Sequence, residues 1–137
     1  MLRRFAGVDA ATVRAARYAA TEVIRDAITL PPTELVEDTA LVADELVANA
    51  VRAGAHSVEL VLELHHDRIE VAVTDDANGW PIPRRPDAHE TSGRGLQIVE
   101  VLTTSWGVTR EPDKRTTVWA HLQCDPSYTT ELPCSLR

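Results

Sequence analysis

Cysteines, aromatic residues and long apolar runs are scarce in this chain of 137 residues. The two cysteines, Cys124 and Cys134, both lie near the C-terminus, so we interpret them as reduced thiols and exclude a disulfide framework. No apolar run approaches the roughly 18–20 residues that span a bilayer. The basic N-terminus is not followed by the apolar stretch of a signal peptide. We therefore expect a cytoplasmic protein with no membrane partner.

Positive charge is also in deficit. Lysine and arginine together number 14 against 21 acidic residues, which gives a net charge of −7. Such a surface repels phosphate backbones, so direct nucleic-acid binding is not expected. The chain has neither a P-loop motif nor a dinucleotide-binding glycine motif after a first strand. The length predicts a single domain, over residues 1–122, followed by a tail over residues 123–137.

The hydrophobic pattern changes its period along the chain. A 3.6-residue period predicts helices with Asp9 and Thr33 as N-caps, and a two-residue period then predicts strands. The expected helices cover residues 10–28, 33–53 and 95–104, and the expected strands cover residues 2–6, 58–64, 69–73, 106–109 and 116–122. Because helices and strands do not alternate regularly, this order indicates an α+β fold with helices on one face of a largely antiparallel sheet.

One polar pair stands on the second predicted helix, in the segment DELVANA of residues 44–50. Glu45 and Asn49 are four residues apart, so they share a face. A carboxylate and an amide oxygen can hold Mg²⁺ or position water. A solvated polar stripe on an amphipathic helix would give the same spacing.

A second motif, DDANG at residues 75–79, follows an apolar strand. Asp75 could accept hydrogen bonds from a ligand amino group, and the small residues Ala77 and Gly79 would let a flat ring approach the backbone. The alternative is an ordinary turn, since turns favour these residue types.

A third motif joins the long loop to the last helix. Gly93, Arg94 and Gly95 stand where free backbone N–H groups and the helix dipole would attract an anion. The alternative is a flexible loop that enters a helix.

Taken together and in this order, the three motifs resemble those of the gyrase, chaperone and histidine-kinase ATPase superfamily. The chain resembles most closely the anti-sigma-factor serine kinases of that superfamily, over about residues 2–122. The resemblance implies a Bergerat-type two-layer sandwich, with helices on one face of a mostly antiparallel mixed sheet. It also implies ATP and Mg²⁺ as cofactors.

The resemblance also implies roles for individual residues. Asn49 would ligate Mg²⁺, and Glu45 would be the general base of phosphoryl transfer. Asp75 would bind the adenine amino group beside Ala77 and Gly79, with Thr117 in support. A mobile lid over the phosphates would contain Gly93, Arg94 and Gly95.

The implied activity is that of a serine/threonine kinase that phosphorylates an anti-anti-sigma partner and also holds a sigma factor. A homodimer is among the assembly states left open. Departures from the family pattern at Ala53, Ala77, Thr91 and Arg115 keep a second interpretation open, a non-catalytic ATP-binding module that acts by protein binding. A structural domain without nucleotide is the third.

The paired histidines His65 and His66 fall in a predicted hairpin turn. We interpret them as solvated turn residues, because the sequence alone brings no further metal ligands near them.

Overall fold

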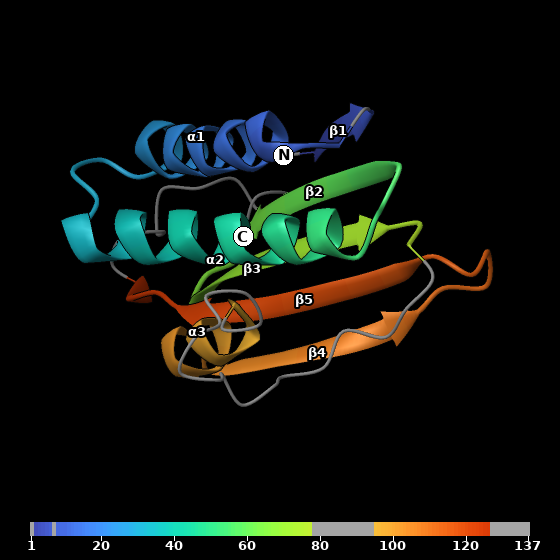
Figure 1. Ribbon diagram of the computed structural model, residues 1–137. Helices are drawn as coiled ribbons and strands as arrows, with labels where there is room; N and C mark the ends of the chain where they lie inside the picture. The colour runs from blue at the N-terminus through green and yellow to red at the C-terminus, as the bar shows by residue number, and fades with distance from the viewer. Residues whose placement is uncertain (1, 7, 78–94, 127–137) are drawn as a thin grey trace, which may run out of the picture.

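The computed structural model describes residues 2–6, 8–77 and 95–126 (Figure 1). Its elements are β1 (Leu2–Ala6), α1 (Ala10–Ala27), α2 (Thr33–Arg52), β2 (Ser57–Leu64), β3 (Arg68–Asp75), α3 (Gly95–Leu102), β4 (Ser105–Arg110) and β5 (Thr116–Gln123). The predicted order of helices and strands is confirmed, and element ends differ from the prediction by at most two residues.

The strands form one five-stranded sheet in the order β1-β2-β3-β5-β4. All four pairings among the described strands are antiparallel. The α+β fold is therefore confirmed, but the mixed sheet that the resemblance implied is not found among these strands. Strand β5 lies between β3 and β4, so the hairpin formed by β4 and β5 joins the rest of the sheet by the pairing of β5 with β3.

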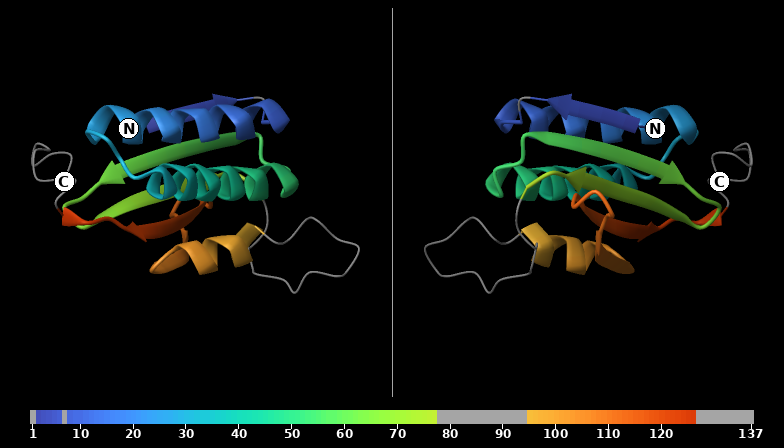
Figure 2. Two further views of the ribbon diagram at one scale, coloured as in Figure 1. Left: turned by 90° about the vertical axis from the view of Figure 1, so that its left-hand side faces the viewer. Right: turned by 90° about the vertical axis from the view of Figure 1, so that its right-hand side faces the viewer.

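One face of the sheet is apolar and is covered by the helices. Strands β2, β3 and β5 alternate strictly between buried and more exposed positions, as a half-buried strand should. Helix α2 packs over β3, with α1 on one side of it and α3 on the other (Figures 1 and 2). The opposite face of the sheet carries no described helix.

The two predicted helix caps have different outcomes. Asp9 caps α1 as expected, since its Oδ1 accepts hydrogen bonds from the backbone N–H groups of Ala11 and Thr12 at 2.9 and 3.2 Å. The prediction for Thr33 is wrong, because Thr33 is already the first helical residue of α2 and Pro32 occupies the N-cap. Proline has no side-chain oxygen that could accept a hydrogen bond from the first N–H groups of the helix, so α2 has no side-chain cap.

Cys124 directly follows β5 as a buried free thiol. Burial raises the pKa of this thiol, with Asp125 adding to the effect, so the thiolate is disfavoured. Cys134 lies outside the described residues. None of the helices in the described ranges is long and apolar enough to cross a membrane.

Candidate functional site

The C-terminal half of α2 carries the first part of the site. Glu45 and Asn49 lie one turn apart and are both partly buried, while Leu46 and Ala50 beside them are buried in the core. Burial raises the pKa of Glu45, the negative charge of Asp44 raises it further, and Arg52 acts in the opposite direction. A carboxyl group with a raised pKa in a partly enclosed place is suited to proton transfer.

Asp75, the last residue of β3, forms the second part. It is only 8% exposed, and its Oδ1 accepts a hydrogen bond from the backbone N–H of Ala77 at 2.8 Å. Burial raises the pKa of Asp75 most, the hydrogen bond from Ala77 opposes this, and the negative charge of Asp76 raises it again. The N–H of Ala77 uses only part of the hydrogen-bonding capacity of this buried carboxylate. The carboxylate is therefore a strong acceptor for a donor group of a ligand.

The next residue, Asp76, ties this strand end to the end of α2. Its Oδ1 accepts hydrogen bonds from the backbone N–H groups of His56 and Ser57, at 2.8 and 3.1 Å. His56 lies in the connection from α2 to β2, and Ser57 is the first residue of β2. The hydrogen bonds therefore hold Asp75 at the same end of the molecule as Asn49, and they also lower the pKa of Asp76.

Strand β5 contributes a threonine that the sequence interpretation missed. In the β3–β5 register Asp75 lies opposite Thr116, which is 1% exposed and has a buried Oγ1 with no hydrogen-bond partner among the described residues. Thr117 points to the other face, where its Oγ1 contacts Oγ1 of Thr74 at 2.6 Å and Oε1 of Glu111 at 3.0 Å. The structure therefore does not bring Thr117 to Asp75.

The signal for Thr116 was present in the sequence. The apolar residues Val118, Ala120 and Leu122 alternate along this strand and continue backwards to Thr116. Because side chains alternate between faces, Thr116 must share the core face with them, and Thr117 must not.

The predicted glycine-rich parts of the site are only partly described. Gly79, Gly93 and Arg94 lie outside the described residues, as does most of the expected lid. Gly95 is the first residue of α3, which packs against α2. Ala77 is buried just beyond Asp75.

The chain matches the family model of the histidine kinase-like ATPase domain over residues 7–122. The chain belongs to this family. A search of curated protein sequences gives no match. The match begins just after β1 and ends at residue 122 in β5, and it includes all three site elements described above.

As a histidine kinase-like ATPase domain, the chain is an ATP-binding domain, and the described residues fit that ligand. The hydroxyl of Thr116 and the carboxylate of Asp75 are buried polar groups on neighbouring strands, which suits recognition of a flat base by hydrogen bonds. Asn49 supplies an amide oxygen, the hard donor that Mg²⁺ prefers. When bound, Mg²⁺ would neutralise charge on the phosphates.

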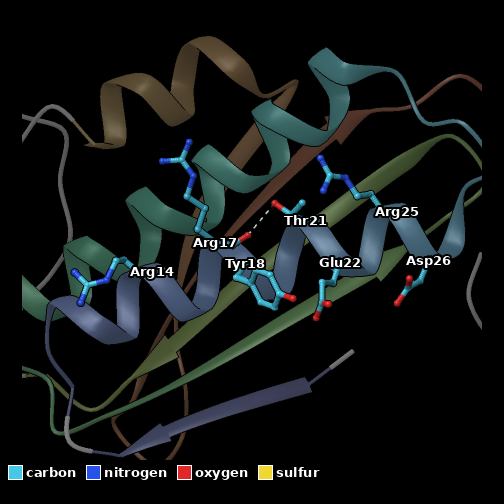
Figure 3. A pocket seen from close by; sticks show the side chains of 7 residues that line it. All are labelled: Arg14, Arg17, Tyr18, Thr21, Glu22, Arg25 and Asp26. Atoms are coloured by element: carbon cyan, nitrogen blue, oxygen red, sulfur yellow. Dashed lines mark hydrogen bonds between the residues drawn. The ribbon is translucent and has the colours of Figure 1, made fainter.

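A separate groove of about 440 Å³ runs along the exposed side of α1 (Figure 3). Its walls are the side chains of Arg14, Arg17, Tyr18, Thr21, Glu22, Arg25 and Asp26. All of these residues come from one helix and their charges are mixed. The groove therefore lacks the convergent groups of a ligand site, in contrast to the candidate site between α2 and the ends of β3 and β5.

Proposed function

We propose that this ATPase domain is a protein serine/threonine kinase of the anti-sigma-factor type, which phosphorylates an anti-anti-sigma partner and so controls a sigma factor by exchange of partners. The observation that carries the proposal is Glu45. A domain that only binds ATP has no need of a partly buried carboxyl group with a raised pKa one turn from the Mg²⁺ ligand Asn49.

The proposed reaction moves the γ-phosphoryl group of ATP to a serine of the partner. The serine oxygen forms a bond to the γ-phosphorus as the bond from that phosphorus to ADP breaks, and Glu45 accepts the hydroxyl proton. Asp75 and Thr116 hold the adenine, and Asn49 holds Mg²⁺. These residues orient the nucleotide for in-line attack, which supplies much of the catalysis in such transfers.

Phosphoryl transfer from labelled ATP to purified anti-anti-sigma-type domains tests the proposal. We expect wild-type protein to label one serine, and a partner with that serine replaced by alanine to stay unlabelled. Glu45→Gln should bind ATP normally and transfer about 10²–10⁴-fold more slowly. Glu37→Gln, an exposed change on the same helix, is the matched control and should transfer at the wild-type rate.

The same assay distinguishes the kinase from the alternative, a non-catalytic ATP-binding module. The substitution of Ala77 for a family glycine favours that alternative, since a buried methyl group narrows the approach to the nucleotide. ATP binding without transfer to any partner, unchanged by Glu45→Gln, would establish the non-catalytic module.

A further inference from the structure

Four titratable side chains meet on the face of the sheet that carries no described helix. Glu63 of β2 lies directly opposite Glu70 of β3, and Glu70 lies directly opposite His121 of β5. His65, two residues after Glu63, joins them from the end of the same strand. These residues were not expected to meet, because they come from three strands.

Two carboxylates opposite each other on neighbouring strands repel and destabilise the pairing unless a positive charge lies between them. Here the ligand atoms of Glu63, His65 and Glu70 all lie within 4.8 Å of one another. Nε2 of His65 is 3.4 Å from Oε2 of Glu63 and 3.6 Å from Oε2 of Glu70. The imidazole nitrogen and the two carboxylate oxygens therefore converge on one point.

These separations fit a shared metal ion better than direct hydrogen bonds. A charge-assisted N–H···O bond is typically about 2.7–2.9 Å long. Donor atoms around a tetrahedral zinc ion, each about 2.0–2.1 Å from the metal, lie about 3.3–3.4 Å apart. The two distances from His65 are close to this tetrahedral edge.

His121 completes the surroundings of Glu70. Its Nε2 is 3.3 Å from Oε2 of Glu70, and its Nδ1 contacts Oγ of Ser105 at 3.2 Å. The ring also lies against Trp119, with centroids 5.0 Å apart. Contacts at both nitrogens fix the orientation of the His121 ring. Residues that do not touch a metal ion commonly orient its ligands through such contacts, and here the oriented ligand would be Glu70.

We propose that Glu63, His65 and Glu70 form a binding site for a divalent transition-metal ion, with Zn²⁺ the best match, and that His121 is a positioning residue for Glu70. One imidazole and two carboxylates leave a fourth position for water, and this donor set suits zinc and its neighbours in the first transition series. The bound ion would tie β2 to β3 at their hairpin. The side chains of His65 and Glu70 are 24% and 30% exposed, so an ion can reach the site from solvent.

The site is independent of the nucleotide. Glu70 and Asp75 are on the same strand but on opposite faces of the sheet, because they are an odd number of residues apart. The test therefore needs no ATP, and its failure would leave the proposed kinase function untouched.

The experiment is a titration of the tag-free, nucleotide-free chain with Zn²⁺ by calorimetry. We expect one ion per chain. His65→Gln and Glu70→Gln should each weaken binding by on the order of 100-fold or more, and His121→Gln by about 10–100-fold. His66→Gln, which changes the neighbouring histidine of the same turn, is the matched control and should bind Zn²⁺ as the wild type does.

Two further measurements distinguish a loss of metal binding from a loss of folding. Melting curves without metal establish that each variant is folded, and added Zn²⁺ should raise the melting temperature of wild type and His66→Gln but not of Glu70→Gln. Co²⁺ should give the strong visible absorption of a low-coordinate site in wild type and His66→Gln but not in Glu70→Gln. Absence of stoichiometric binding by wild type, or equal binding by folded Glu70→Gln, would overturn the proposal and leave an ion-pair cluster.

Discussion

Thr116 lies directly opposite Asp75 where β5 pairs with β3, and both side chains are buried on the helix-covered face of the sheet. The hydroxyl of the neighbouring Thr117 lies on the other face of the sheet, where it is hydrogen-bonded to the side chains of Thr74 and Glu111. Two adjacent threonines therefore have separate roles. We assign Thr116 to the proposed nucleotide site, whereas Thr117 links β5 to β3 through Thr74.

Valine substitutions test this division, because valine keeps the shape of threonine and removes only the hydroxyl. Thr116→Val should lower ATP affinity by about 2- to 13-fold, the loss of one hydrogen bond of ~0.5–1.5 kcal/mol. Thr117→Val should leave ATP affinity unchanged and lower the free energy of unfolding by ~0.5–1.5 kcal/mol. Calorimetry and denaturant unfolding measure the two quantities, and equal losses of ATP affinity in both variants would contradict the assignment.

Asp75→Asn should weaken ATP binding. One acceptor oxygen becomes a donor that faces the adenine amino group, and such a mismatch costs ~1–3 kcal/mol, or about 5- to 150-fold in affinity. Asp67→Asn, an exposed change in the β2–β3 hairpin, is the control and should bind ATP normally. Unchanged ATP affinity of Asp75→Asn in calorimetry would remove Asp75 from the site.

The same variant should be more stable than the wild type at neutral pH. Because burial raises the folded-state pKa of Asp75, the charged form is disfavoured in the folded state, and wild-type stability falls as pH rises through that pKa. The gain from Asp75→Asn should therefore be present at neutral pH and disappear below the ordinary carboxyl pKa. Denaturant unfolding at several pH values measures it.

Asn49→Ala should weaken binding of MgATP much more than binding of metal-free ATP, because the amide oxygen is assigned to the ion. Titrations with Mg²⁺ and with a chelator in its place make the comparison within one variant. An equal loss under both conditions would place Asn49 against the nucleotide itself.

The rate of phosphoryl transfer should fall in acid at a pH above the ordinary glutamate range. Only unprotonated Glu45 can accept the serine proton, and burial raises the pKa at which this form is lost. A pH profile of single-turnover transfer should show this acid limb in wild type. The residual activity of Glu45→Gln should lack it, and an identical limb in both proteins would exclude Glu45 as its source.

Gly107→Ala should destabilise the fold by ~1–3 kcal/mol through overpacking. A Cβ at this position would lie 2.5 Å from Cζ2 of Trp119 on the neighbouring strand. The cost should shrink in a Trp119→Leu background. Gly54→Ala is the contrast. Gly54 has a positive φ of 83°, and a Cβ added there would meet no atom within 4 Å beyond the neighbouring residues, so Trp119→Leu should not change the cost of this substitution.

Much of the fold could be predicted because it depends on local patterns. The change from a 3.6-residue to a two-residue period placed helices α1 and α2 and strands β2 and β3, and the motif around Glu45 and Asn49 fixed their common helix face. Helix starts were less certain. Asp9 and Thr33 are both residue types that favour the N-cap position and both precede a helical pattern. Whether such a residue is the N-cap depends on where the first helical turn begins.

What the sequence by itself determined was each element and the side of it that is apolar, since both follow from the spacing of neighbouring residues. The tertiary structure decided which strands are neighbours and in what register. Glu70 and His121 are 51 residues apart, and they meet only because β5 enters the sheet beside β3. The same pairing puts Thr116 opposite Asp75. The physical reason is that strand order and register depend on long-range burial of the core face, which no local window of sequence contains.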